Sequence, residues 1–380
     1  MIRIVADHKI PFLQGALEGV ASVRFLPGGE ISRDDLVDAD ALITRTRTIC
    51  NKELLEHTGI RFIASATIGY DHIDTDFCDQ AGIGWTNAPG CNASSVQQYV
   101  VSALLCLAVR RGFDLDGLTL GVVGVGHVGS RVARAGQALG MKVLLNDPPR
   151  ARSEGAEAFT PLEKLLEQAD VITLHVPLNR KGEDKTAGMV DNRFTGRVKR
   201  GAVLINTSRG GVVEEDALVR GLSSGKLGDV VLDVFRGEPV VNPGLLDAVT
   251  LATPHIAGYS LDGKANGTGM AVRAVSKYFS LDMDDWQPSG IPLPEDPVLD
   301  VDAGSRSGRG LLWDLYRKTY DITRDDAMLR NDPSAFEQLR GDYPFRRELG
   351  AYSVRLSGGS HWFRGLIETL GFTVLQEPLI

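Results

Sequence analysis

The chain has 380 residues, of which 43% are hydrophobic and 24% are charged, an ordinary composition for a folded protein that argues against global disorder. Acidic residues exceed basic ones by 49 to 41, and the resulting net charge of −8 argues against general nucleic-acid binding, which needs a basic surface. No run approaches the ~18 apolar residues of a membrane helix, and the first residues lack the apolar stretch of a signal peptide, so we expect a cytoplasmic protein without membrane contact.

Cysteine usage agrees with that expectation. The four cysteines, Cys50, Cys78, Cys91 and Cys106, form no CxxC pair and no cluster with zinc spacing. We therefore expect a reduced compartment and no metal site. At ~100–200 residues per domain, the length predicts two or three domains.

The first part of the chain alternates strand-like and helix-like segments. Short apolar runs predict strands, and the stretches between them have helical character. Alternation of this kind predicts a parallel sheet. The expected strands are residues 2–6, 41–44, 62–65 and 83–85, and the expected helices lie around 34–37 and 52–56.

A longer helix and a second α/β region follow. Apolar residues recur at helical spacing over 94–108, which predicts an amphipathic helix, and a second domain should begin between residues 90 and 115. Beyond it come continuous apolar runs, typical of strands buried on both faces. They predict a doubly wound nucleotide-binding domain. The expected strands are residues 118–123, 142–146, 171–174, 202–206, 230–233 and 249–252.

The pattern changes again after residue 281. Residues 282–310 are rich in Asp, Pro, Gly and Ser and are typical of a long connection. Two helical segments follow, and the last part runs strand, helix, strand. These residues predict a small α+β appendage. Its expected helices are 311–321, 335–339 and 362–370, and its expected strands are 351–356 and 372–375.

A glycine-rich turn lies between a predicted strand and a predicted helix. Gly124 permits the tight turn, Gly126 lets a pyrophosphate approach the backbone, and Gly129 lets the helix pack close to the strand. The helix N-terminus then offers free N–H groups to the phosphates. The alternative is a glycine-containing turn without a ligand, but the correct context on both sides favours a dinucleotide site, which also includes His127 and Val128.

Asp147 ends the strand after this turn. An acidic residue about 20 residues beyond the glycines accepts hydrogen bonds from the ribose hydroxyls and repels a 2′-phosphate, so NAD is favoured over NADP. Arg150 and Arg152 keep NADP open, because arginines near this position can bind the extra phosphate.

Arg209, Glu238 and His255 each lie just beyond a strand-like run of the same domain. An imidazole titrates near ~6.5, so His255 can take a hydroxyl proton as hydride leaves and return it in the reverse direction. Glu238 can accept a hydrogen bond from the other ring nitrogen, and the planar fork of Arg209 suits a carboxylate. Each residue alone would more often be structural. Together at strand ends beside a dinucleotide turn, they predict a dehydrogenase.

The segments 206–211, 233–239 and 253–258, together with Gly124 to Gly129, resemble the D-isomer-specific 2-hydroxyacid dehydrogenase family over about residues 1–280. The resemblance implies that Arg209, Glu238 and His255 are the catalytic set. It also implies an α/β fold in which a doubly wound NAD domain is inserted into a discontinuous, flavodoxin-like substrate domain, with a small C-terminal α+β domain that forms a homodimer. The implied boundaries are 1–95 and 256–282 for the substrate domain, 96–255 for the NAD domain and 283–380 for the C-terminal domain.

The resemblance extends to ligand contacts. Asp233 would hold the nicotinamide side of NAD, and further residues would line the cofactor: Thr207, Ser208, Gly258, His175 and Val176. The substrate would be a small phosphorylated hydroxy acid, in contact with Arg45, Thr46, Thr67 and Tyr259. Arg45 directly follows a strand, where ligands bind in α/β proteins, whereas Arg47 is as well explained by a solvated charge.

Alternatives remain open at this point. Another member of the family could act on 3-phosphoglycerate or hydroxypyruvate, and an NAD-sensing binding protein could share the fold and keep the three residues. One departure concerns the long helix, where many relatives carry a glutamate and this chain has Gln97 and Gln98.

We predict that His255→Ala lowers kcat by at least ~10²-fold, the usual scale of acid/base assistance. NADH should still bind, since the imidazole is assigned to proton transfer. Steady-state kinetics and an NADH fluorescence titration measure the two effects. An unchanged kcat would remove His255 from this role.

Overall fold

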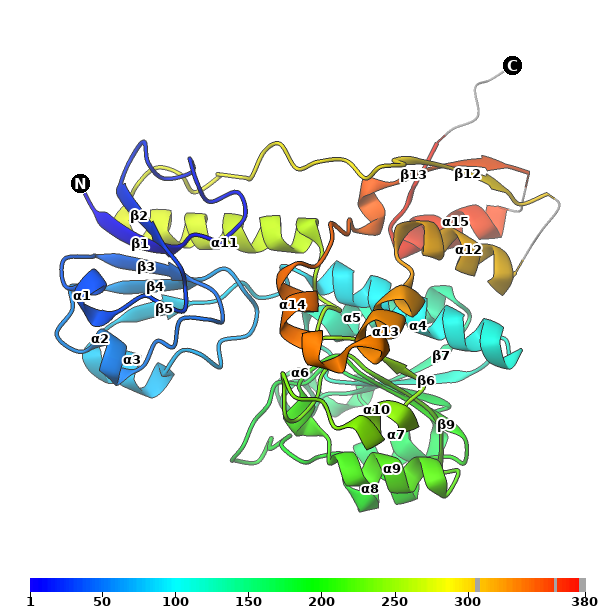
Figure 1. Cartoon of the computed structure of the whole chain (residues 1–380). Helices are drawn as coiled ribbons and strands as arrows, with labels where there is room; N and C mark the ends of the chain where they lie inside the picture. Colours follow the sequence, from blue (N-terminus) through cyan, green and yellow to red (C-terminus); the bar gives the residue numbers. More distant parts are fainter. Residues whose placement is uncertain (305–307, 359–360, 376–380) are drawn as a thin grey trace. The chain divides into compact units, whose positions relative to one another are not determined.

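The computed structural model describes residues 1–304, 308–358 and 361–375, so the end of the expected C-terminal domain, 376–380, lies outside the described residues. The chain forms two compact units (Figure 1). Unit 1 comprises Met1–Asn92 and Ser260–Pro292. Unit 2 comprises Ala93–Tyr259 and Leu293–Ile380.

Unit 1 is built on a five-stranded parallel sheet in the order β2-β1-β3-β4-β5. The half-exposed edge strand β2 was not expected, because its five residues include an arginine and carry a weak apolar signal. The long helix α11 packs on β4 and contributes Ala271, Val272 and Val275 to the core on one face. Helices α1 to α3 contribute to the core on the other face. The strands are β1 (Arg3–Asp7), β2 (Ser22–Leu26), β3 (Ala41–Thr44), β4 (Phe62–Ser65) and β5 (Gly84–Thr86), and the helices are α1 (Arg33–Leu36), α2 (Lys52–Leu55), α3 (Thr75–Ala81) and α11 (Leu261–Phe279).

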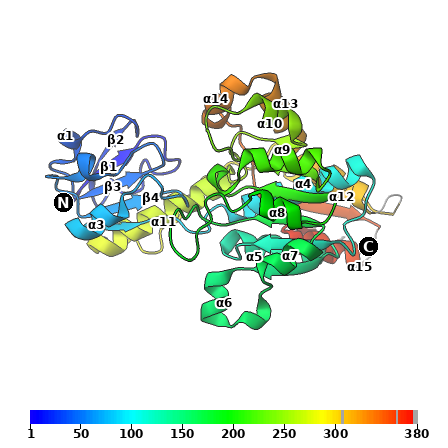
Figure 2. The same cartoon turned by 90° about the horizontal axis from the view of Figure 1, so that it is seen from below.

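Unit 2 contains the expected doubly wound domain. Its six strands are all parallel, in the order β11-β10-β9-β8-β6-β7, with helices on both faces (Figures 1 and 2). The order reverses beside β6, which pairs with β7 on one side and with β8 on the other. The strands are β6 (Thr119–Val123), β7 (Lys142–Asn146), β8 (Val171–Leu174), β9 (Ala202–Asn206), β10 (Leu227–Leu232) and β11 (Leu251–Ala252).

Alternate strand residues point into two separate cores. Val122, Ile205 and Val231 belong to the core that α4 and α5 share. Val123, Leu204 and Leu232 belong to the core that α7 to α10 share. This is the arrangement that continuous apolar strands predict. The helices are α4 (Ala93–Arg111), α5 (His127–Ala138), α6 (Pro148–Glu154), α7 (Leu162–Gln168), α8 (Asn192–Arg197), α9 (Glu215–Ser223) and α10 (Pro243–Ala248).

The prediction of an amphipathic helix over 94–108 was right about the helix and wrong about its exposure. From Ser95 to Ala108, helix α4 is buried on all sides, including the polar residues Gln97, Gln98 and Ser102. The reason is tertiary, because α4 packs against α5 and also against α12 and α13 from the C-terminal part of the chain. Neither α4 nor any other helix in the described part of the chain is long and apolar enough to cross a membrane.

Among its described residues, the C-terminal part of unit 2 adds a three-stranded parallel sheet, β12-β13-β14, and four α-helices. The prediction of a connection over 282–310 was wrong in one place, where β12 buries Leu299 and Val301 and exposes its aspartates. Five residues of that alternation are too few to stand out in an Asp- and Pro-rich stretch. The elements are β12 (Val298–Asp302), α12 (Arg309–Thr319), α13 (Ile322–Asn331), α14 (Phe336–Gly341), β13 (Ser353–Ser357), α15 (His361–Leu370) and β14 (Thr373–Val374).

Candidate active site

The expected functional residues of unit 2 follow the carboxyl ends of its parallel strands. Because these ends lie along one edge of the sheet, the segments that follow them share that edge. The glycine turn follows β6 and His175 follows β8, at the point where the strand order reverses. The remaining residues are Asp147 after β7, Thr207 to Arg209 after β9, Asp233 and Glu238 after β10, and His255 after β11.

The glycines of the turn meet three different constraints. Gly124 has a φ of +85°, and a Cβ there would lie 2.5 Å from the carbonyl oxygen of His175. A Cβ on Gly129 would lie 2.0 Å from the carbonyl oxygen of Gly124. Gly126 caps the N-terminus of α5, and a Cβ there would meet no atom within 4 Å. The first and last glycines are thus needed by the fold, whereas open space beside Gly126 fits the approach of a pyrophosphate.

Asp147 ties the turn to the end of β7. Its Oδ2 accepts a hydrogen bond from Val125 N at 2.8 Å, and its Oδ1 accepts one from Arg150 N at 3.1 Å. A carboxylate oxygen has more than one acceptor site, so Asp147 can still accept from ribose hydroxyls. Arg150 pairs with Glu154, and Arg152 pairs with Asp184. Both arginines therefore already have carboxylate partners.

The segments after β8 and β9 are joined by polar side chains. Nε2 of His175 lies 3.0 Å from Thr173 Oγ1, and Nδ1 lies 3.4 Å from Thr207 Oγ1. Burial lowers the pKa of His175 to about 3, so the ring is neutral at physiological pH. His175 therefore offers the cofactor site an uncharged surface next to Val176.

A compact turn presents Arg209. Asn206 Oδ1 accepts hydrogen bonds from the N–H and the hydroxyl of Ser208, and its Nδ2 donates to the carbonyl of Arg209 at 3.1 Å. Nη1 of Arg209 donates to the carbonyl of Ser208 at 2.8 Å. A Cβ on Gly210 would lie 2.0 Å from the carbonyl of Phe235, so this glycine lets the Arg209 and Glu238 segments meet. Asn206 and Gly210 were not among the expected site residues, although both stand in the motif that contains Arg209.

Glu238 and His255 form the expected pair. Nδ1 of His255 lies 2.7 Å from Oε2 of Glu238, and Oε1 of Glu238 accepts a hydrogen bond from Phe235 N at 2.8 Å. Burial acts to raise the pKa of Glu238, but the hydrogen bond and charge of His255 and the Phe235 N–H outweigh it and leave the pKa lowered. An ionised carboxylate only accepts, so the proton lies on Nδ1 and Nε2 is the ring atom available to a substrate.

His255 stands in a turn whose shape is set by Asp233. We call residues His255–Tyr259 the catalytic turn. His255 has a φ of +57°, in the left-handed region. The carboxylate of Asp233 accepts hydrogen bonds from Ile256 N at 2.7 Å, Ala257 N at 2.9 Å and Thr253 Oγ1 at 2.7 Å. Both oxygens of Asp233 therefore hold the turn, and its proposed contact with the nicotinamide side stays a prediction.

Burial raises the pKa of Asp233 to about 6, against the opposing effects of His255 and the three donors. The ordinary value is 3.8, so the folded chain binds this proton more tightly than the unfolded chain does. The contribution of Asp233 to stability consequently falls as the pH rises from about 4 to about 6. At neutral pH the ionised group costs stability while it accepts the three hydrogen bonds.

Tyr259 has partners that the sequence did not indicate. Its hydroxyl accepts a hydrogen bond from Nη2 of Arg340 at 3.3 Å, and the Arg340 guanidinium lies over its ring, 5.8 Å from the centroid. Arg340 belongs to α14 in the C-terminal part, and no motif drew attention to it. Its charge also acts on Glu238, whose pKa it helps to lower.

The other expected substrate contacts lie in unit 1. Arg45 and Thr46 follow β3, and Thr67 lies just beyond β4. Nε of Arg45 donates to Oδ2 of the buried Asp7 at 3.0 Å, and the Thr67 hydroxyl lies 2.9 Å from Ser65 Oγ. These residues are thus at the carboxyl ends of neighbouring strands, and their contact with a substrate stays a prediction.

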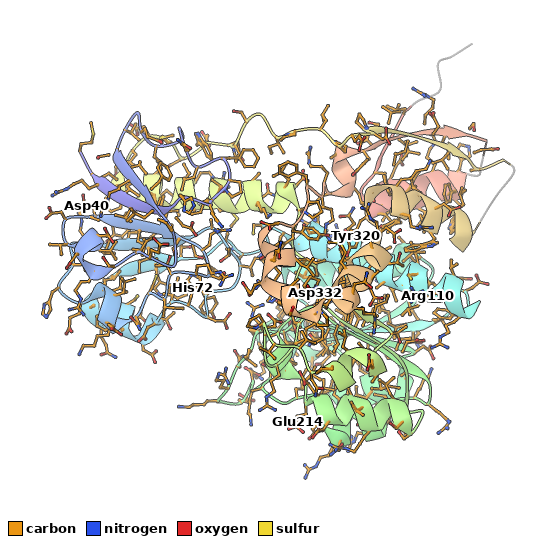
Figure 3. The ribbon with its side chains drawn as sticks, viewed as in Figure 1. Asp40, His72, Arg110, Glu214, Tyr320 and Asp332 are labelled. Atoms are coloured by element: carbon orange, nitrogen blue, oxygen red, sulfur yellow. The ribbon has the colours of Figure 1, made fainter. Side chains whose placement is uncertain are left out.

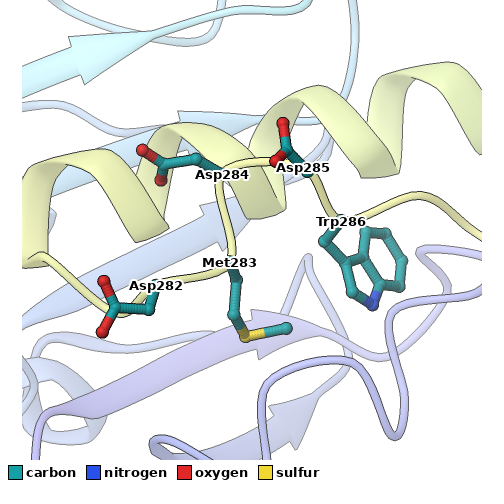
Figure 4. A pocket seen from close by; sticks show the side chains of 5 residues that line it. All are labelled: Asp282, Met283, Asp284, Asp285 and Trp286. Carbon is teal, nitrogen blue, oxygen red and sulfur yellow. The ribbon is translucent and has the colours of Figure 1, made fainter.

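A pocket of about 460 Å³ lies elsewhere in unit 1, on the segment after α11 (Figure 4). Its lining residues run from Asp282 to Trp286 and include none of the expected site residues. The Asp284 carboxylate already accepts a hydrogen bond from Ser276. We assign this pocket no ligand.

The residues of unit 2 can therefore hold a dinucleotide and move a proton. The glycine turn, the N-terminus of α5 and Asp147 fit the pyrophosphate and ribose of NAD. When bound, NAD supplies a hydride acceptor. Nε2 of His255 can accept a proton from a hydroxyl group while Glu238 stabilises the resulting imidazolium, and the Arg209 fork can orient a carboxylate.

Comparison with known proteins agrees with this geometry. Residues 104–257 match the family described as D-isomer specific 2-hydroxyacid dehydrogenase, NAD binding domain, and residues 293–370 match a domain of unknown function, DUF3410. The chain is 46% identical to an erythronate-4-phosphate dehydrogenase of Bacteroides fragilis over 93% of this chain and 99% of that protein. It is 43% identical to one of Yersinia pestis over 98% of this chain and 99% of that protein.

A solved structure shares the fold. The D-lactate dehydrogenase of Aquifex aeolicus, crystallised with NAD and lactic acid, is 29% identical to this chain. It matches with a TM-score of 0.62 over 74% of this chain and 96% of that one.

The glycine turn gives a matched pair of substitutions. We predict that Gly129→Ala destabilises the protein by roughly 1–3 kcal/mol, because its Cβ collides with the Gly124 carbonyl. Gly126→Ala should leave the melting temperature unchanged and weaken NADH binding at least ~10-fold, or ~1.4 kcal/mol, because its Cβ enters the space assigned to the pyrophosphate. Thermal melting and NADH titration measure both. A Gly126→Ala protein that binds NADH normally would contradict this placement.

Proposed function

Because the chain belongs to the D-isomer specific 2-hydroxyacid dehydrogenase family, we propose that it oxidises 4-phospho-D-erythronate at C2 with NAD. The product is 3-hydroxy-2-oxo-4-phosphooxybutanoate, in a step of pyridoxal 5′-phosphate biosynthesis that takes place in the cytoplasm. The observation that supports this substrate is the similarity to proteins named erythronate-4-phosphate dehydrogenase over nearly the whole of both chains.

The chemistry follows from the residues of the site. Nε2 of His255 accepts the C2 hydroxyl proton as the C2–H bond breaks and a ketone forms, and NAD, when bound, would supply the acceptor for the hydride that leaves. Glu238, at 2.7 Å from Nδ1, stabilises the imidazolium that results. Arg209 binds the C1 carboxylate and the reacting oxygen. The atoms and charges balance without a further reactant.

Recognition of the phosphate is assigned to other residues. Arg45, Thr46 and Thr67 follow strands of the sheet in unit 1, where ligands of α/β proteins bind. Tyr259 is the proposed contact from the catalytic turn. We propose that these four residues distinguish a phosphorylated acid from an acid that lacks the phosphate.

A substrate panel tests the function. Turnover of erythronate 4-phosphate, 3-phosphoglycerate and D-glycerate is followed in parallel by the absorbance of the reduced nicotinamide, with His255→Ala as the inactive control. We expect the highest kcat/KM for erythronate 4-phosphate. If another acid is turned over well and erythronate 4-phosphate is not, the proposed substrate is rejected, but the proposed reaction type stands. Turnover of none would favour an NAD-sensing binding protein.

We also propose a homodimer formed through the C-terminal domain. The support is the exposure of large apolar side chains there, since Phe345 is 82% exposed and Trp362 is 63% exposed. Deleting the whole domain would not test this, because it would uncover the buried faces of α4 that pack on α12 and α13.

Surface substitution gives a cleaner test of the dimer. Light scattering after gel filtration should give a mass near twice 41.0 kDa for the natural chain. Introducing charge with Phe345→Glu and Trp362→Glu should shift the measured mass toward that of the monomer. The control Ile49→Glu, at a 58% exposed position of unit 1, should leave the mass unchanged. A natural chain that runs as a monomer at all concentrations would reject the proposal.

A further inference from the structure

The C-terminal domain touches the segments that carry the catalytic residues at several points. Asp326 of α13 accepts a hydrogen bond from Ala252 N at 2.8 Å, at the end of the edge strand β11. Arg330 of the same helix donates to the carbonyls of Leu246 and Val249, just before β11. Helix α13 therefore fixes the strand that leads directly to His255.

The next segment of the domain reaches the catalytic turn itself. Nη2 of Arg346 donates to the carbonyl of Ala257 at 2.5 Å, and Nη2 of Arg340 donates to the hydroxyl of Tyr259 at 3.3 Å. The ring of Tyr343 packs edge-on against Tyr259, with centroids 6.0 Å apart. The catalytic turn is thus held from two sides, by Asp233 through its N–H groups and by the C-terminal domain through a carbonyl and a side chain.

A third contact reaches the Glu238 segment. The ring of Phe336, at the start of α14, meets the ring of Phe235 at 81°, with centroids 6.1 Å apart. Phe235 N is the donor to Glu238 Oε1. The Arg340 guanidinium lies over the ring of Phe336, 5.9 Å from the centroid.

Packing alone does not explain Arg346. The residue is 5% exposed, and its Nε and Nη1 have no hydrogen-bond partner. Its guanidinium lies over the ring of Tyr320 (labelled in Figure 3), 4.4 Å from the ring centroid. Unpartnered N–H groups cost free energy in a buried position, and a methionine would fill similar space without that cost. What an arginine adds is a positive charge that acts on the buried Asp325, together with hydrogen bonds from Nη2 to the carbonyls of Ala257 and Ser95.

We propose that the C-terminal domain, whose family has no assigned function, holds the catalytic turn in its working geometry, with Arg346 and Arg340 as positioning residues for His255 and Tyr259. The inference rests on the proposed dehydrogenase function for its kinetic consequences. The domain is then part of the active-site architecture, independently of any role in dimerisation.

Kinetics of the full-length chain test this. Arg340→Met and Arg346→Lys should lower kcat by on the order of 10- to 100-fold, the effect of a small misplacement of a catalytic group. Arg340→Lys should recover part of the loss, because it keeps the charge and a donor toward Tyr259. The control is Arg355→Met, an exposed arginine of the same domain that pairs with Asp300, which should keep full activity. Melting temperatures close to that of the control show that the variants fold.

A substrate-free measurement separates this proposal from the proposed function. The Nδ1–H proton of His255, hydrogen-bonded to Glu238, should give a far-downfield NMR signal that His255→Ala removes. We expect Arg340→Met and Arg346→Lys to shift or broaden it and Arg355→Met to leave it unchanged. If no acid is turned over by the natural chain, the function fails and this signal still decides the inference. The inference is overturned if folded Arg340→Met and Arg346→Lys both keep the natural kcat and the natural NMR signal. If Arg346→Lys does not fold, Arg340→Met alone decides.

Discussion

The buried carboxylate of Asp233 is the constraint on which the position of His255, the proposed acid/base, depends. It stands at the end of β10 and accepts three hydrogen bonds, two of them from the backbone directly after His255. His255 itself adopts a left-handed backbone conformation. A neutral apolar residue in place of Asp233 would leave the buried N–H groups of Ile256 and Ala257 without partners. The free energy that the buried charge costs is therefore linked to the position of the imidazole.

The two carboxylates around His255 differ in their burial and in their contact with its imidazole. Asp233 is fully buried and Glu238 is partly buried, and burial alone raises the pKa of each. For Glu238 the hydrogen bond and the charge of His255 outweigh burial, so the group is ionised when the imidazole needs a counter-charge. For Asp233 burial dominates and the pKa lies at about 6. The first carboxylate serves proton transfer and the second serves the backbone, an assignment that residue type alone could not give.

The sequence was most informative where the residue pattern of a short segment determines its structure. Strands such as Ala41–Thr44 and Ala202–Asn206 matched their expected bounds because strands buried on both faces are continuous apolar runs. The sequence likewise placed the glycine turn and the three proposed catalytic residues just beyond strands, which is where the structure has them. Arg340 and Arg346 were missed because they lie in a charged segment, where nothing local distinguishes an arginine that contacts an active site from a solvated one. Only tertiary packing brings that segment to residues 255–259.

Helix α4 connects these observations. Its Tyr99 hydroxyl lies 2.7 Å from the Thr253 hydroxyl, which in turn donates to Asp233. Directly before Tyr99, Gln97 donates to the carbonyl of Leu370, and Gln98 donates to the carbonyl of Arg347. A glutamate at either position has only acceptor oxygens when ionised and would face these carbonyls with a buried charge. The two glutamines thus supply the hydrogen-bond donors that the carbonyls of the C-terminal domain need where it packs on α4. Through Tyr99 and Thr253, the same helix supports Asp233 and the catalytic turn.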